Sequence, residues 1–174
     1  GQQKRVSIGV ELLTRPGLFF LDEPTSGLDP GTETAFMHLM RRLADQGRTI
    51  IMVTHATKNV MLADKVVFLA RGGYLAWFGP PDEALAYFDQ YRNEHDRRIR
   101  SMEFDQIYAI LDDSKLGEPK DWAARFKASS AYSKYIADPL KLDGQPATQT
   151  QSQPVKRTAQ KKSRSSSLHQ FLVL

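Results

Sequence analysis

Cysteine is absent from this 174-residue chain, and long apolar runs are absent as well. Without thiols the chain can form neither a disulfide framework nor a thiolate metal site. No apolar run approaches the roughly 18 to 20 residues that cross a bilayer, and no basic-then-apolar signal segment stands near the start. With 41% hydrophobic and 25% charged residues, we expect the sequence as written to form one globular core without a membrane span.

The net charge of +4 is unevenly divided along the chain. Residues 140–174 hold six basic residues and one acidic residue, which leaves 18 basic and 19 acidic residues before them. Residues 141–166 are rich in Gln, Thr, Ser and Pro, so they cannot bury enough apolar surface to offset their ordering entropy, and we predict a disordered basic linker. It is interpreted as a solvated linker, with lipid-headgroup attraction and nonspecific nucleic-acid contact as alternatives; no specific nucleic-acid site is expected.

Hydrophobic periodicity predicts a strand, a helix and a second strand in the first third of the chain. The runs Leu18–Leu21 and Thr49–Val53 are short and continuously apolar, which is typical of strands buried on both faces of a parallel sheet. Thr32–Ala44 carries apolar residues on one helical face, and Gln3–Leu13 predicts another short helix before the first strand. Parallel strands joined through a helix form a right-handed βαβ unit, so the fold class is α/β.

Later segments predict a hairpin and several helices. Two strand-like runs flank Arg71 within Lys65–Gly79, and a Pro-started helix follows over residues 80–91. Two more amphipathic stretches lie within residues 102–111 and 122–136. Trp77 is expected to pack with Phe78 in a second β-rich layer, and four methionines are interpreted as core residues: Met37, Met40, Met52 and Met61.

Polar side chains follow both predicted parallel strands at the point where each strand ends. Asp22 and Glu23 follow the first, and Thr54 and His55 follow the second. Ligands of parallel sheets bind outside the carboxyl ends of the strands, so these side chains are expected on one rim. Neighbours on an extended segment point to opposite sides, so Asp22 is expected to hold Mg²⁺ while Glu23 faces a water molecule.

This rim has the parts that phosphoryl transfer to water requires. They are a metal, a carboxylate that orients or deprotonates the nucleophile, and a donor such as His55 near the developing charge. The alternatives are a solvated strand end for the two acids and a structural role for the histidine. Asp29 before Pro30 predicts a helix N-cap, and Ser26 and Gly27 are typical turn residues.

Three segments in this order and spacing resemble the second half of an ATP-binding-cassette (ABC) ATPase: GQQKRVSIGVELL, LFFLDEPTSGLDP and IIMVTH. The resemblance extends over about residues 1–88, and it implies a P-loop NTPase fold with ATP and Mg²⁺ as cofactors. By this resemblance Asp22 is the metal ligand, and Glu23 and His55 are the catalytic residues. The remaining nucleotide-binding positions that it implies are the end of the signature motif and the D-loop: Gly1, Gln2, Ser26, Gly27 and Asp29.

Two further segments, GGYLAWFGPPDEALAYF and SSLHQFLVL, resemble the branch of half-transporters in which the ATPase precedes the membrane domain. This branch includes pigment, sterol and drug transporters and bacterial relatives. It implies a head-to-tail dimer with a second ATPase subunit, a transmembrane domain, and a location at the cytoplasmic face of the plasma or inner membrane. The expected organisation is an ATPase half (1–90), a helical extension (91–140), the linker (141–166) and a membrane-proximal segment (167–174) that begins an interfacial helix.

Of the signature motif, only the last Gly and the Gln after it are present, as Gly1 and Gln2. No G-x-x-x-x-G-K-[ST] motif occurs in the sequence. Without that loop there is no backbone cradle and no lysine for the β- and γ-phosphates. We therefore expect a fragment of a larger ABC transporter ATPase that is inactive when isolated. The alternatives are a soluble ABC-type ATPase of the repair or translation type, and a noncatalytic scaffold.

Overall fold

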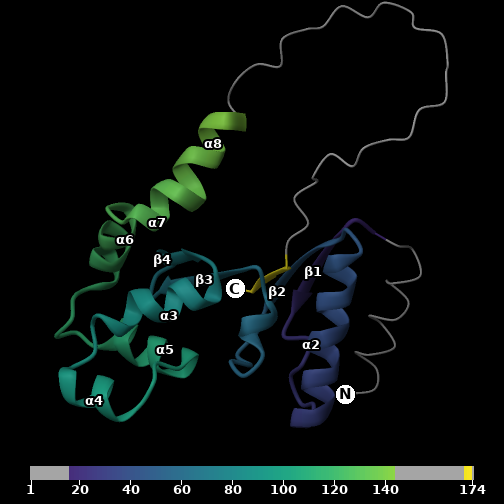
Figure 1. The fold of residues 1–174 in the computed structure, drawn as a ribbon, viewed down its shortest axis with the longest axis horizontal. Coiled ribbons are helices and arrows are strands. Elements are labelled where there is room, and N and C mark those ends of the chain that lie inside the picture. The colour runs from purple at the N-terminus through teal and green to yellow at the C-terminus, as the bar shows by residue number, and fades with distance from the viewer. Residues whose placement is uncertain (1–15, 144–170, 174) are drawn as a thin grey trace, which may run out of the picture.

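The computed structural model describes residues 16–143 and 171–173, which form a mixed α/β fold (Figure 1). One sheet has the order β1-β2-β5-β3-β4, with strands β1 (Leu18–Asp22), β2 (Thr49–Val53), β3 (Lys65–Ala70), β4 (Tyr74–Gly79) and β5 (Phe171–Val173). The helices are α2 (Pro30–Asp45), α3 (Pro81–Asp89), α4 (Glu94–Ile99), α5 (Phe104–Asp112), α6 (Pro119–Lys127), α7 (Ser130–Tyr132) and α8 (Asp138–Asp143). Two short turns complete the described elements: the 3₁₀ turn η1 (Val60–Leu62) and the π-helical turn η2 (Ser133–Ala137).

The predicted strand, helix and strand are confirmed as β1, α2 and β2. The two strands are parallel, with a register that runs from Leu18 beside Thr49 to Asp22 beside Val53. The prediction that both faces of β1 are buried is wrong, because Phe19 is 7% exposed whereas Phe20 is 72% exposed. Side chains alternate along a strand, and only one face of β1 packs into the described core.

The hairpin is also confirmed, but it does not belong to a second layer. Strands β3 and β4 are antiparallel and lie in the same sheet as β1 and β2. Trp77 is buried, with its ring centroid 4.9 Å from Tyr87 and 5.6 Å from Phe126, while Phe78 is only partly buried. The tryptophan therefore attaches α3 and α6 to the sheet.

The end of the chain departs from the expected interfacial helix. Phe171–Val173 form β5, which pairs in parallel with β2 on one side and with β3 on the other. A central position gives the backbone groups of this segment strand partners that an isolated extended segment would lack. The helix prediction is therefore wrong for these three residues.

The predicted linker is also partly corrected, because its first residues continue α8. Lys141 pairs with Asp138 one turn earlier, at 3.2 Å between Nζ and Oδ1. The remaining linker residues, 144–166, and the predicted helix Gln3–Leu13 lie outside the described residues.

Apolar residues of the sheet, α2 and the later helices form the core. Met37, Met40 and Met52 are buried as predicted, but Met61 is 55% exposed because it lies in the surface turn η1. The amphipathic stretch that became α5 buries Ile107, together with the other apolar residues of its inner face, Phe104, Ile110 and Leu111. These contacts attach the helices after residue 90 to the sheet.

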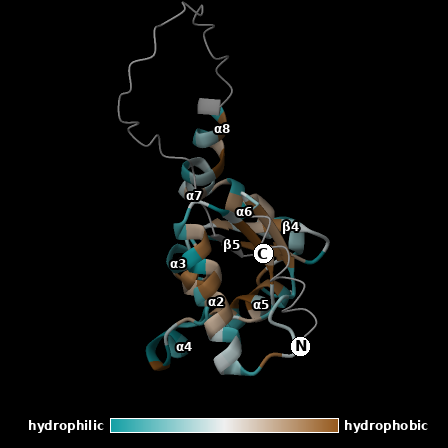
Figure 2. Ribbon diagram, turned by 90° about the vertical axis from the view of Figure 1, so that its right-hand side faces the viewer, coloured by the Kyte–Doolittle hydropathy of each residue, from teal (hydrophilic) through white to brown (hydrophobic). Residues whose placement is uncertain are grey.

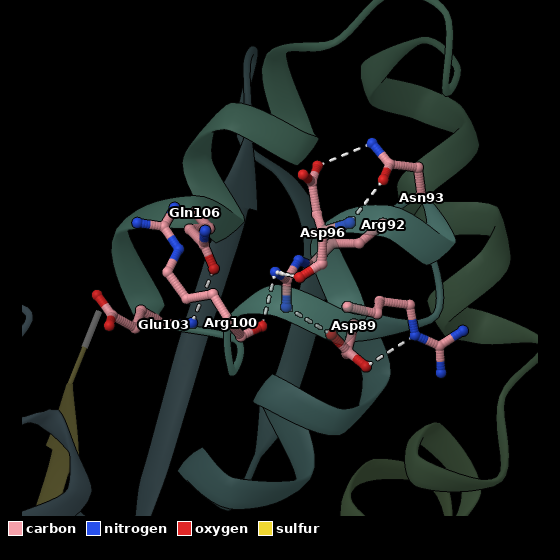
Figure 3. Close-up of polar contacts among 8 residues, drawn as sticks. Asp89, Arg92, Asn93, Asp96, Arg100, Glu103 and Gln106 are labelled. Atoms are coloured by element: carbon pink, nitrogen blue, oxygen red, sulfur yellow. Dashed lines mark hydrogen bonds and ion pairs between the residues drawn. The ribbon is translucent and has the colours of Figure 1, made fainter.

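Helix α4 is held by polar contacts instead of apolar ones. It has no buried residue and is largely hydrophilic (Figure 2). The Arg92 side chain is 6% exposed and donates to Asp89 Oδ1 and to the carbonyl oxygens of Asp96 and Arg100, each at 2.9 Å (Figure 3). The Asn93 side chain caps the helix by accepting from the Asp96 N–H at 2.8 Å.

Candidate functional site

The structure brings together the two residues that the sequence predicts to be catalytic. Glu23 follows β1 and His55 follows β2, and their Oε1 and Nε2 atoms are 3.0 Å apart. The histidine side chain is 89% exposed and the glutamate side chain is 29% exposed. The pair therefore lies at the carboxyl ends of two parallel strands, with the imidazole open to solvent and the carboxylate half-buried.

The backbone of Glu23 explains how its side chain reaches the histidine. Glu23 has φ = 47°, in the left-handed region, and its N–H donates to Val53 O at 2.9 Å. This conformation is uncommon for a residue other than glycine and is found at functional sites where neighbouring structure enforces it. The expectation that Asp22 and Glu23 alternate along one extended segment is therefore wrong, because the extended backbone ends at Asp22.

Asp22 is the last residue of β1 and lies opposite Val53 in the register. Its side chain is exposed on the same rim as Glu23. Among the described residues, no group of three or more His, Asp or Glu side chains could hold a metal ion. A magnesium ion in a nucleotide site commonly takes one or two carboxylates, with phosphate oxygens and water as its other ligands. A single exposed aspartate fits that requirement.

Two buried threonines connect the segments that carry the pair. Thr25 and Thr54 are each 5% exposed, and their hydroxyl oxygens are 3.4 Å apart. Thr54 Oγ1 also accepts from the N–H of Ala56 at 3.0 Å. The contact between Thr25 and Thr54 joins the turn after Glu23 to the loop after β2. Sequence reasoning placed Thr54 on the rim but missed Thr25, because no local pattern shows that two residues 29 positions apart meet.

Ser26 and Gly27 form the turn that was predicted to be the D-loop. The Ser26 N–H donates to Glu23 O at 3.2 Å, and Leu28 N–H donates to Thr25 O at 3.1 Å. Gly27 has φ = 76°, which favours glycine although a side chain there would have space. Both residues are exposed, and the turn begins directly at the candidate acid.

Asp29 is confirmed as the N-cap of α2. Its Oδ1 accepts from the N–H groups of Gly31 and Thr32 at 3.1 and 3.0 Å, and its Oδ2 accepts from the Thr32 hydroxyl. Pro30 occupies the first helical position, as predicted. Gly1 and Gln2, the remaining candidate nucleotide-binding residues, lie outside the described residues.

The cap predicts a pH-dependent contribution of Asp29 to stability. The hydrogen bond from the Thr32 side chain, followed by backbone hydrogen bonds, holds the pKa of Asp29 below its ordinary value of 3.8. A lowered folded-state pKa stabilises the fold above the unfolded-state pKa, and that contribution is lost as the pH falls through the folded-state value. We expect Asp29→Asn to be less stable than the wild type at pH 7, with the charge-dependent part of the difference lost as the pH falls from the ordinary value of 3.8 through the lower folded-state pKa of Asp29.

Urea denaturation of both proteins between pH 7 and pH 2 measures this difference. Asp29→Ser is the matched control, because serine keeps a capping oxygen without a titrating charge. Its stability difference from Asp29→Asn should not change across the acid range. A wild-type advantage that is equally large at pH 7 and pH 2 would contradict the assigned charge effect.

Tyr108 of α5 is a residue near the site that sequence reasoning missed. Burial raises its pKa, and the negative charge of Glu23 raises it further. It lies 85 positions after Glu23 in a helix whose pattern indicated only packing. No sequence signal marks this proximity, because it depends on how α5 docks on the sheet.

One family model and several curated proteins are similar to parts of this chain. Residues 3–58 match a family described as "AAA domain, putative AbiEii toxin, Type IV TA system". Among curated proteins, the chain is 49% identical over 83 residues to "ABC transporter ATP-binding/permease protein Rv1747" of Mycobacterium tuberculosis, covering 48% of this chain and 10% of that protein. It is 38% identical over 127 residues to "Broad substrate specificity ATP-binding cassette transporter ABCG2" of Bos taurus, covering 68% and 19%.

The chain is also similar to a fungal protein. The chain is 45% identical over 97 residues to "Multidrug resistance protein CDR2" of Candida albicans, covering 52% of this chain and 6% of that protein. These matches support an ABC-type ATPase segment. The chain spans less than a fifth of the length of each of these three relatives, 19% at most. Within residues 16–143 and 171–173, no helix has the length and apolarity that a bilayer crossing needs.

Proposed function

We propose that this chain supplies the Walker B acid, the switch histidine and the D-loop of an ATP-hydrolysing site in an ABC half-transporter whose ATPase precedes its membrane domain. The observation that carries the proposal is the 3.0 Å contact between Glu23 and His55 at the carboxyl rim of two parallel strands. The similarity to the ATP-binding transporters of Mycobacterium tuberculosis and Bos taurus supports the same reaction class.

In this proposal Glu23 orients the attacking water and accepts its proton. The side chain is partly desolvated, and its left-handed backbone directs it toward the loop of His55. The exposed imidazole donates toward the charge that develops on the transferred phosphoryl group. Asp22 would hold Mg²⁺, which neutralises phosphate charge when it is bound.

The proposed partners follow from the same assignment. The exposed Ser26–Gly27 turn, together with Asp29, would face a second ATPase subunit, and Gly1 and Gln2 would contact the nucleotide of that subunit. The proposed arrangement is an ATPase half over 1–90, a helical extension that continues through α8 to Asp143, and a basic linker over 144–166, after which Phe171–Val173 pair with the sheet as β5. The linker would lie at the cytoplasmic face of the membrane, where its basic residues attract anionic headgroups.

The magnesium dependence of ATP hydrolysis by the intact protein tests the proposal. We expect hydrolysis to require Mg²⁺, and Asp22→Asn to raise the half-saturating Mg²⁺ concentration by at least about tenfold, because a neutral amide is a weaker ligand than a carboxylate. Asp113→Asn, on an exposed loop outside the rim, is the matched control and should leave the requirement unchanged. An unchanged Mg²⁺ requirement in Asp22→Asn would overturn the metal assignment.

The isolated 174-residue chain provides the second arm of this test. Its sequence contains no G-x-x-x-x-G-K-[ST] motif, so we expect neither tight ATP binding nor hydrolysis from it alone. Tight binding by the isolated chain would contradict this assignment. Hydrolysis by an intact protein that lacks apolar spans would favour a soluble ABC-type ATPase, and an intact protein without hydrolysis would favour a scaffold.

A further inference from the structure

We propose that Tyr108, in the helical extension, is a positioning residue for the Glu23–His55 pair. Its ring supports the loop of residues 54–57 that carries His55, so α5 forms part of the wall of the site. The inference rests on the function proposed above and assigns a role to a helix that lies outside the segments that resemble the ATPase.

The loop and the helix meet across a small cavity. Its lining includes Thr54, Ala56 and Thr57 on the loop side, and Phe104 and Tyr108 on the side of α5. The cavity volume is about 10 Å³, which is room for about one water molecule. The loop therefore faces Phe104 and Tyr108 across a narrow gap.

Tyr108 is itself held firmly on the sheet. Its ring packs edge-on against Phe68 of β3, with centroids 5.8 Å apart and an interplanar angle of 67°. Phe104, one turn earlier in α5, stacks on the ring of Phe68, with the two ring centroids 6.4 Å apart. Phe68 and Phe104 are 5% and 7% exposed, whereas Tyr108 is 42% exposed. Tyr108 therefore packs against the buried core through Phe68 and is partly open to solvent.

Tyr108 is close enough to Glu23 to sense the charge of its carboxylate. The Glu23 carboxylate raises the pKa of Tyr108, as a negative charge near a phenol does, in addition to the effect of burial. His55 has an 89% exposed side chain, so its position depends on the backbone of the loop. Thr25 contacts the start of this loop through Thr54, and Tyr108 lines the cavity on the α5 side of the loop.

A loss of this support should change the chemical step more than nucleotide binding. Misplacement of catalytic groups by about 1 Å can cost roughly 10²-fold in rate. A partial loss of support in Tyr108→Ala should therefore lower kcat about tenfold, while KM for ATP stays within about twofold. Tyr108→Phe keeps the ring, so its kcat should stay within about threefold of the wild type.

The experiment measures steady-state ATP hydrolysis by the intact protein, with thermal unfolding midpoints for every variant. Tyr74→Ala is the matched control, because Tyr74 is 46% exposed at the start of β4 and does not line the cavity beside the loop. The inference is overturned if folded Tyr108→Ala has the kcat of Tyr74→Ala, or if Tyr108→Phe loses as much as Tyr108→Ala. If Tyr108→Ala does not fold, Tyr108→Leu replaces it. We expect the kcat of Tyr108→Leu to be at least about threefold lower than that of the wild type. A wild-type kcat in Tyr108→Leu would overturn the inference.

Glu23→Gln measured in the same preparation separates the two proposals. If Glu23→Gln stops hydrolysis while Tyr108→Ala leaves kcat unchanged, the positioning role is wrong and the proposed function stands. If Glu23→Gln hydrolyses ATP like the wild type, the proposed function fails, and the role of Tyr108 fails with it. Loss of hydrolysis in Glu23→Gln together with the expected split between kcat and KM in Tyr108→Ala supports both.

Discussion

Glu23→Gln in the intact protein is expected to lower steady-state ATP hydrolysis by roughly 10²–10⁴-fold while ATP binding is retained. The amide has nearly the size of the carboxylate, so it can occupy the same half-buried position after β1. It cannot accept a proton from water, and it places no negative charge 3.0 Å from the imidazole of His55. The loss should therefore appear in kcat.

Steady-state turnover and equilibrium ATP binding, measured on the same preparation, test this expectation. Glu94→Gln is the matched control, because the Glu94 side chain is 84% exposed on α4 and lies outside the site. Its hydrolysis should equal that of the wild type. Turnover of Glu23→Gln within a few-fold of the wild type would show that another group accepts the proton.

The parts of the fold that the sequence predicted well depend on local patterns. Alternation of apolar runs with a capped amphipathic segment identified β1, α2 and β2, and Asp29 and Pro30 identified where the helix begins. The convergence of Glu23 and His55 followed from the general rule for parallel strands, which needs only strand direction and strand order. These features require no knowledge of distant contacts.

The features that the sequence did not predict arise from long-range packing or from strain. The left-handed backbone of Glu23 has no sequence signature, because non-glycine residues rarely adopt it and the surrounding structure enforces it. The contact between Thr25 and Thr54 and the approach of Tyr108 both join segments that are far apart in the chain. The apolar residues of β5 fit a membrane-proximal helix equally well by composition, and only the pairing with β2 and β3 distinguishes the two.

The aromatic cluster around Trp122 makes the helical extension part of the same core as the ATPase half. Trp122 is fully buried on α6, with its ring centroid 4.8 Å from Tyr91 and 6.0 Å from Phe88, the latter on α3. The guanidinium of Arg125 lies 4.6 Å from the tryptophan ring centroid and donates to Leu116 O. These contacts join the helical extension after residue 90 to α3 before it, so a loss of packing at α6 should also destabilise the sheet.

Trp122→Ala is accordingly expected to lower the free energy of unfolding of the 174-residue chain by about 3–5 kcal/mol, the usual cost of removing a buried tryptophan. Within the described residues the indole Nε1 has no hydrogen-bond partner, so the loss comes from packing and from the contact with Arg125. Urea denaturation followed by circular dichroism measures it, with Ile99→Ala, 69% exposed, as a control that should change stability little. Because the free energy of unfolding of small domains is about 5–15 kcal/mol, the variant should be near the limit of folding. A loss of unfolding free energy below about 1 kcal/mol would mean that α6 is not packed on this core in solution.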